Sequence, residues 1–106
     1  MKRLASIQDI SCIGKCSLTA ALPVISAAGV EAAVMPTALL STHTAFNNFT
    51  FLDLTDEIKK IAYHWKKEKF EFDCIYTGYL GSVRQIDIVS EIIDDIKCDK
   101  TLIVTD

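Results

Sequence analysis

The chain has 106 residues, of which 50% are hydrophobic and 24% are charged, and its formal net charge is -3. A chain of this length and composition can bury one modest core, so we expect at most one domain and no disordered, collagen-like or coiled-coil structure. Lysines and glutamates are interspersed and leave no basic surface, so neither nucleic acid nor an anionic membrane is an expected partner.

Cysteine spacing and the amino-terminal residues indicate a cytoplasmic protein. The cysteines match neither a C-x-x-C redox pair nor a paired zinc-ligand pattern, and we interpret them as reduced thiols. They are Cys12, Cys16, Cys74 and Cys98. The first three residues lead into a short strand rather than an apolar signal-peptide core, and no apolar run approaches the roughly 18 residues of a membrane span.

The amino-terminal segment predicts a strand followed by a helix. Leu4 to Ile10 is a short, mainly apolar run that ends in polar residues, as in a strand buried on both faces. Apolar residues at helical spacing follow Ser17, which we expect to cap the helix through its side chain. Gly29 stands where a left-handed residue would end that helix.

A second strand and an irregular segment come next. Val30 to Met35, closed by Pro36, predicts a strand, and the resulting strand, helix and strand have the length of a βαβ unit with a parallel sheet. Residues 37–54 follow neither period. Their aromatic, β-branched and asparagine residues predict extended segments and loops that form a flap or a small edge sheet.

The second half of the chain predicts two helices that alternate with two strands. Thr55, followed by two acidic residues, begins an amphipathic helix that ends in lysines. Phe72 to Thr77 predicts a strand, and Ser82 with Gln85 forms a capping box for the next helix. Thr101 to Thr105 predicts the last strand.

Three polar stretches follow predicted parallel strands. These are Asp9 to Ser17, Ser41 to Thr44, and Thr77 to Tyr79. Because the carboxyl ends of parallel strands meet at one edge of a sheet, we expect these stretches to form a site there. Neither a G-x-G-x-x-G turn nor a P-loop is present, so no nucleotide-binding motif is assigned.

The individual residues of this edge leave alternatives open. Asp9 is either a hydrogen-bond acceptor for a ligand or a partner for backbone donors in the turn. Ser17 is interpreted as a helix cap rather than a nucleophile, and Cys16 as a small apolar wall. His43 either contacts a planar ligand or is structural. Tyr79 either presents its ring to an aromatic substrate or closes the core.

Five segments, taken together and in order, resemble the pyridoxal kinase family within the ribokinase-like superfamily. They are Ile7 to Asp9, Gly14 to Ser17, Ser41 to Thr44, Thr77 to Ser82, and Val104 to Asp106. The resemblance implies a three-layer α/β fold with a mostly parallel sheet flanked by helices. Residues 1–106 would be its incomplete amino-terminal half, the substrate-side part of a single kinase domain.

The resemblance also implies an activity. The parent enzyme would use ATP and Mg²⁺ to phosphorylate the 5′-hydroxymethyl group of pyridoxal, pyridoxine or pyridoxamine in vitamin B6 salvage, as a homodimer. Thr44 and Ala45 would contact the substrate. His43 and Tyr79 would face its ring, and Cys16 would pack on it.

Two further positions, Asp9 and Asp106, need separate comment. Asp9 occupies a place that is often serine in the family, so its contact to the ring nitrogen or hydroxyl is a departure. Asp106 matches the aspartate that begins an Asp-Pro-Val motif near the nucleotide phosphates and the metal. It is placed on the nucleotide and metal side of the site.

The family's remaining machinery is not found in these 106 residues. It comprises the acidic metal-site motif, the nucleotide loops and a Gly-x-Gly-Asp segment whose aspartate is the base. Because phosphoryl transfer depends on positioning phosphates and neutralising charge, we assign no catalytic residue or metal ligand here and expect the chain alone to be inactive. Two alternatives remain, a hydroxymethylpyrimidine kinase of the thiamin pathway and a non-catalytic binding module.

Overall fold

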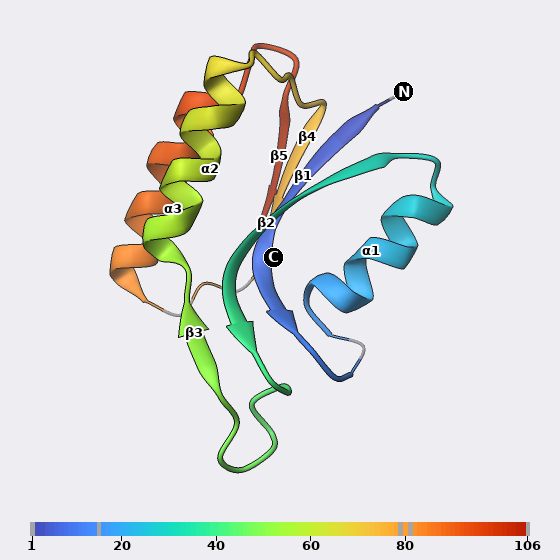
Figure 1. Ribbon diagram of the computed structural model, residues 1–106. Coiled ribbons are helices and arrows are strands. Elements are labelled where there is room, and N and C mark those ends of the chain that lie inside the picture. Colours follow the sequence, from blue (N-terminus) through green and yellow to red (C-terminus); the bar gives the residue numbers. More distant parts are fainter. Residues whose placement is uncertain (1, 15, 79, 81, 106) are drawn as a thin grey trace.

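The computed structural model describes residues 2–14, 16–78, 80 and 82–105. Within these residues, a five-stranded sheet in the order β3-β2-β1-β4-β5 is accompanied by three helices (Figure 1). The elements are β1 (Arg3–Ser11), α1 (Leu18–Ala27), β2 (Glu31–Leu40), β3 (Phe51–Asp53), α2 (Thr55–Lys67), β4 (Cys74–Thr77), α3 (Val83–Ile96) and β5 (Leu102–Thr105).

The sheet is parallel except at one edge. β1 pairs in parallel with both β2 and β4, and β4 pairs in parallel with β5. β3 pairs antiparallel to the end of β2. The parallel strands are joined by helical crossovers, as parallel connections require, so the carboxyl ends of β1, β2 and β4 lie at the same edge.

Helices cover both faces of the sheet. α2 and α3 lie side by side on one face and α1 lies on the other, as Figure 1 shows. The main core fills the space between the sheet and the α2–α3 pair. Its buried members are Ala5, Ile7, Met35, Ile58, Ala62, Phe72, Ile75, Val89, Ile92 and Ile96. The predicted three-layer α/β arrangement is confirmed.

β2 extends further than its sequence predicts. It continues through Pro36 to Leu40, whereas the proline was expected to close it. Pro36 pairs with Gln8 of β1, and β3 pairs with β2 only from Ala38 onward. Proline lacks an N–H donor, so it is tolerated where one side of the strand has no ladder to complete. Residues 37–54 were expected to form a flap or a small edge sheet, and within them β3 is an edge strand of the main sheet.

The helix starts agree with their predicted positions, but one cap differs. α2 begins at Thr55, and Ser82 accepts a hydrogen bond from the Gln85 N–H at 3.1 Å, as the capping box predicts. Gly29 ends α1 with φ +76°. The predicted side-chain cap of α1 is wrong, since Ser17 makes no capping hydrogen bond and its hydroxyl turns to Asp9 instead.

Candidate functional site

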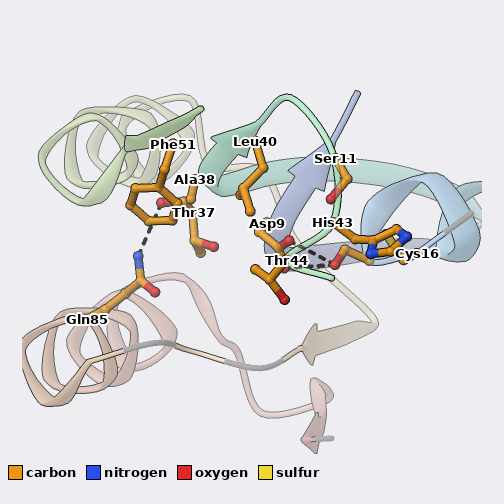
Figure 2. Close-up of a pocket in the computed structure, with 11 residues that line it drawn as sticks. Asp9, Ser11, Cys16, Thr37, Ala38, Leu40, His43, Thr44, Phe51 and Gln85 are labelled. Carbon is orange, nitrogen blue, oxygen red and sulfur yellow. Dashed lines mark hydrogen bonds between the residues drawn. The ribbon is translucent and has the colours of Figure 1, made fainter. Parts of the chain in front are cut away.

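A cavity of about 460 Å³ lies at the carboxyl ends of β1 and β2, closed on one side by the first turn of α3 (Figure 2). Four of the substrate-binding residues predicted from the sequence line it, namely Asp9, Cys16, His43 and Thr44. Seven more residues complete the lining. They are Ser11, Ser17, Thr37, Ala38, Leu40, Phe51 and Gln85.

The other predicted site residues are Ala45, Tyr79 and Asp106. Ala45 does not line the cavity, but its backbone N–H donates to Nδ1 of His43 at 3.2 Å. Tyr79 and Asp106 lie outside the described residues, so their predicted roles stay predictions. The cavity therefore collects residues of two of the three predicted polar stretches, while Thr77 of the third ends β4 at the same edge of the sheet without lining the cavity.

Asp9 reaches the cavity from an irregular part of β1. The pairing of β1 with β2 shifts register between Gln8 and Ile10, and such a bulge redirects the side chain within it. The Ser17 hydroxyl lies 2.9 Å from each carboxylate oxygen of Asp9 and donates to them (Figure 2). A carboxylate offers about four acceptor sites, so Asp9 can accept further hydrogen bonds from a ligand.

His43 is held by contacts on several sides. The Ala45 N–H donates to Nδ1, which places the proton of the neutral imidazole on Nε2. The ring of Phe46 lies 4.8 Å away between centroids, and a Cβ added at Gly14 would be in van der Waals contact with Cδ2 of His43, at 3.5 Å. His43 thus presents Nε2–H as its free donor.

Gln85 ties three elements together beside the cavity. Its side-chain amide donates to the backbone oxygen of Thr37 at 3.1 Å and to the Thr55 hydroxyl at 3.2 Å. All three residues are buried. The bonds fix the first turn of α3 against β2 and the start of α2. Sequence reasoning assigned Gln85 to the capping box and missed this role, because the role depends on contacts with residues distant in the sequence.

Apolar side chains form the remaining walls. Ala38 and Leu40 come from the end of β2, and Phe51 comes from the edge strand β3. Figure 2 shows Phe51 with its ring beside Ala38. Apolar walls with a few convergent polar groups are typical of pockets for small molecules.

A second cavity of about 570 Å³ lies between α1 and the sheet. Val24 of α1, Tyr76 of β4 and Val104 of β5 line it. Asp9 and Ser17 line both cavities, so their hydrogen-bonded pair lies between the two. Cys74 also faces this space, and burial raises the pKa of its thiol. All four cysteines lie in the described part of the chain and none forms a disulfide.

No protein-family model and no curated protein matches the chain, whereas solved structures do. A protein of Bacteroides thetaiotaomicron VPI-5482 assigned as a phosphomethylpyrimidine kinase matches with a TM-score of 0.95 and 50% identity, over 99% of this chain and 36% of that one. Its orthorhombic form, with pyridoxal, matches with a TM-score of 0.93. The pyridoxal kinase of Lactobacillus plantarum matches with a TM-score of 0.91 and 30% identity, over 100% of this chain and 38% of that one.

The chain is an amino-terminal portion of a ribokinase-like kinase. This ribokinase-like chain spans little more than a third of the length of the structures described above. The structures that it resembles are a pyridoxal kinase and a protein assigned as a phosphomethylpyrimidine kinase.

The described residues contain neither a cluster of metal ligands nor a helix that could span a membrane. Among residues 2–14, 16–78, 80 and 82–105, no three His, Cys, Asp or Glu side chains come together as metal ligands. The helices in the same residues are too short or too polar to cross a membrane.

Proposed function

We propose that the chain forms the amino-terminal, substrate-side part of a single-domain pyridoxal kinase. The complete enzyme transfers a phosphoryl group from ATP to the 5′-hydroxymethyl group of pyridoxal, pyridoxine or pyridoxamine. The observation that carries this proposal is the cavity that collects Asp9, Cys16, His43 and Thr44 at the carboxyl edge of the sheet. The Bacteroides protein with pyridoxal, 50% identical to this chain, supports it.

In this proposal the cavity binds the pyridine ring of the vitamin. Leu40 and Phe51 contact the ring faces, while the His43 Nε2–H donates to the ring substituents and Asp9 accepts from them. The walls exclude water around the ring and leave the hydroxymethyl group as the reacting end. Binding in a fixed orientation is the contribution that this part of the kinase makes to the reaction.

The proposal also names the phosphoryl donor and the part of the kinase that binds it. A pyridoxal kinase of Leishmania donovani with the same fold was solved in complex with ADP, which supports ATP as the donor. We place the nucleotide loops, the catalytic base and the Mg²⁺ site in the portion of the kinase that this chain does not span. Because this chain does not span those parts, we expect it to be inactive alone. We also expect the complete enzyme to be a cytoplasmic homodimer.

A hydroxymethylpyrimidine kinase is the second candidate. The Bacteroides protein is assigned as a phosphomethylpyrimidine kinase although one of its crystal forms is with pyridoxal. Both substrates are six-membered nitrogen heteroaromatics that carry a hydroxymethyl group. A cavity of about 460 Å³ accommodates either ring.

Parallel turnover assays on the complete protein separate the two candidates. With ATP and Mg²⁺, we expect kcat/KM to be higher for pyridoxal, pyridoxine or pyridoxamine than for hydroxymethylpyrimidine. Brisk turnover of hydroxymethylpyrimidine alone would establish the second candidate instead. Absence of turnover with all four compounds, in a folded protein, would refute both.

A further inference from the structure

Ser11 is the one buried polar side chain of the described residues whose oxygen has no hydrogen-bond partner. It is 0% exposed, stands at the end of β1 and lines the cavity two residues beyond Asp9. Figure 2 shows its hydroxyl oxygen turned toward the other lining side chains. Sequence reasoning included Ser11 in the polar stretch after the first strand but gave it no role.

An unpaired hydroxyl in this position is costly. A buried donor or acceptor that is left unsatisfied has lost its hydrogen bonds to water without gaining one in the fold. Ser6, on the same strand and also 0% exposed, shows the usual outcome, because its hydroxyl accepts a hydrogen bond from the Gln8 side chain at 2.9 Å. The fold therefore satisfies the buried serine that is remote from the cavity and leaves unsatisfied the one that lines it.

We propose that Ser11 is a substrate-binding residue whose hydroxyl donates to an acceptor of the bound heteroaromatic ring, such as a ring nitrogen or a hydroxyl oxygen. The inference rests on the proposed function and assigns a residue that the family resemblance does not. A hydroxyl on so short a side chain changes direction by rotation about its Cα–Cβ bond, so it can pair with a ligand without movement of the strand.

Asp9 and Ser11 would bind different groups of the substrate. Asp9 is an acceptor when ionised, so it pairs with donors of the substrate and cannot serve its acceptors. Ser11 supplies a donor from the same strand end. Together they match a ring that presents both a donor and an acceptor on one side, which is true of hydroxypyridines and of aminopyrimidines.

The test compares Ser11→Ala with Ser6→Ala in the complete protein. For Ser11→Ala we expect the Tm without ligand to equal or exceed that of the wild type, because an unsatisfied hydroxyl is removed. The Kd for pyridoxine, measured by calorimetry, should rise about five- to tenfold, with KM raised and kcat nearly unchanged. Ser6→Ala should lower the Tm and leave the Kd unchanged.

Other outcomes are equally decisive. An unchanged Kd in Ser11→Ala, whatever the Tm, would overturn the role of Ser11 while leaving the proposed function intact. If Ser11→Ala both lowers the Tm and raises the Kd, Ser11→Cys decides between the two readings. A wild-type Tm with a raised Kd in Ser11→Cys supports the proposal. A wild-type Tm and a wild-type Kd refute it. A wild-type protein that binds neither pyridoxine nor hydroxymethylpyrimidine would overturn the proposed function and this inference together.

Discussion

The Ser17 hydroxyl donates to the Asp9 carboxylate, with both carboxylate oxygens 2.9 Å away, and so links the end of β1 to the start of α1. Ser17 has φ +52° and ψ -131°, a combination that non-glycine residues rarely adopt. The hydrogen bond holds the chain in this conformation beside the cavity. A side chain that would ordinarily cap the helix is instead used to fix the position of a carboxylate.

This geometry predicts an unusual order of stabilities at position 17. Ser17→Ala should lower the free energy of unfolding by about 1–2 kcal/mol, because it removes a hydrogen bond to a charged group and keeps the strained backbone. Ser17→Gly also removes the bond but relieves the strain, so its loss should be smaller by about 0.5–1 kcal/mol. Denaturant unfolding of the complete protein measures both. A glycine variant less stable than the alanine variant would contradict the role of strain.

His43 is expected to act through its Nε2–H. His43→Phe keeps a ring for packing on Phe46 but removes the donor, so KM for pyridoxine should rise about tenfold with a small change in stability. The chain's other histidine provides the control. His64 is exposed on α2 beside Glu68, and His64→Phe should leave KM unchanged. Equal KM values for the wild type, His43→Phe and His64→Phe would show that His43 does not bind the substrate.

Gly14 is expected to matter for binding as well as for stability. Its φ of +106° disfavours any side chain, and an added Cβ would lie 3.5 Å from His43. Gly14→Ala should cost about 1–2 kcal/mol of stability, because alanine is strained at this φ, and a shift of the loop beside His43 that relieves this strain should also raise KM. Gly29→Ala is the matched control, with φ +76° and no atom within 4 Å of the added Cβ. It should lose stability without a change in KM.

Acid should destabilise the fold through Asp73. The backbone N–H of Arg3 donates to this carboxylate at 2.8 Å and, with smaller help from Lys100, lowers its pKa from the ordinary value of 3.8. Because the folded pKa is below the unfolded one, the stabilisation is complete above about pH 4 and is lost as the pH falls through the folded value. Asp73→Asn cannot titrate. Its free energy of unfolding should therefore depend less steeply on pH below 4 than that of the wild type.

The secondary structure was largely predictable, because it depends on local patterns. The amphipathic period that begins at Thr55 and the capping box at Ser82 use residues close in sequence, and both starts agree with the structure. The length of β2 was not predictable from Pro36. Whether a proline ends a strand depends on which neighbour it faces, and that is decided by β1 and β3.

The site was predictable in its place but less so in its detail. Strand-end reasoning brought Asp9 and His43 to one edge, and both line the cavity. The contribution of Gln85 depends on contacts with Thr37 and Thr55, which are 48 and 30 residues away in sequence. The choice of Ser17 between a helix end and a carboxylate depends on the turn that brings it back to Asp9, eight residues earlier in the chain.

The edge strand β5 predicts how residues 1–106 behave alone. Leu102 is 63% exposed, and the neighbouring Ile103 and Val104 are exposed as well. An apolar strand edge is a template for pairing with another chain, so the isolated fragment should self-associate. Sedimentation of Val104→Lys should show less association than that of the unmodified fragment. Val83→Lys, at an exposed position outside the sheet, should not, and a monomeric unmodified fragment would refute the prediction.

The antiparallel edge has a consequence for how a ligand reaches the cavity. β3 pairs with β2 over three residues, and all three of its side chains are exposed, so its opening free energy should be among the lowest in the sheet. Phe51, a wall of the cavity, is carried on this strand. Fraying of β3 would therefore open one wall of the cavity while β1, β2 and β4 keep their pairing.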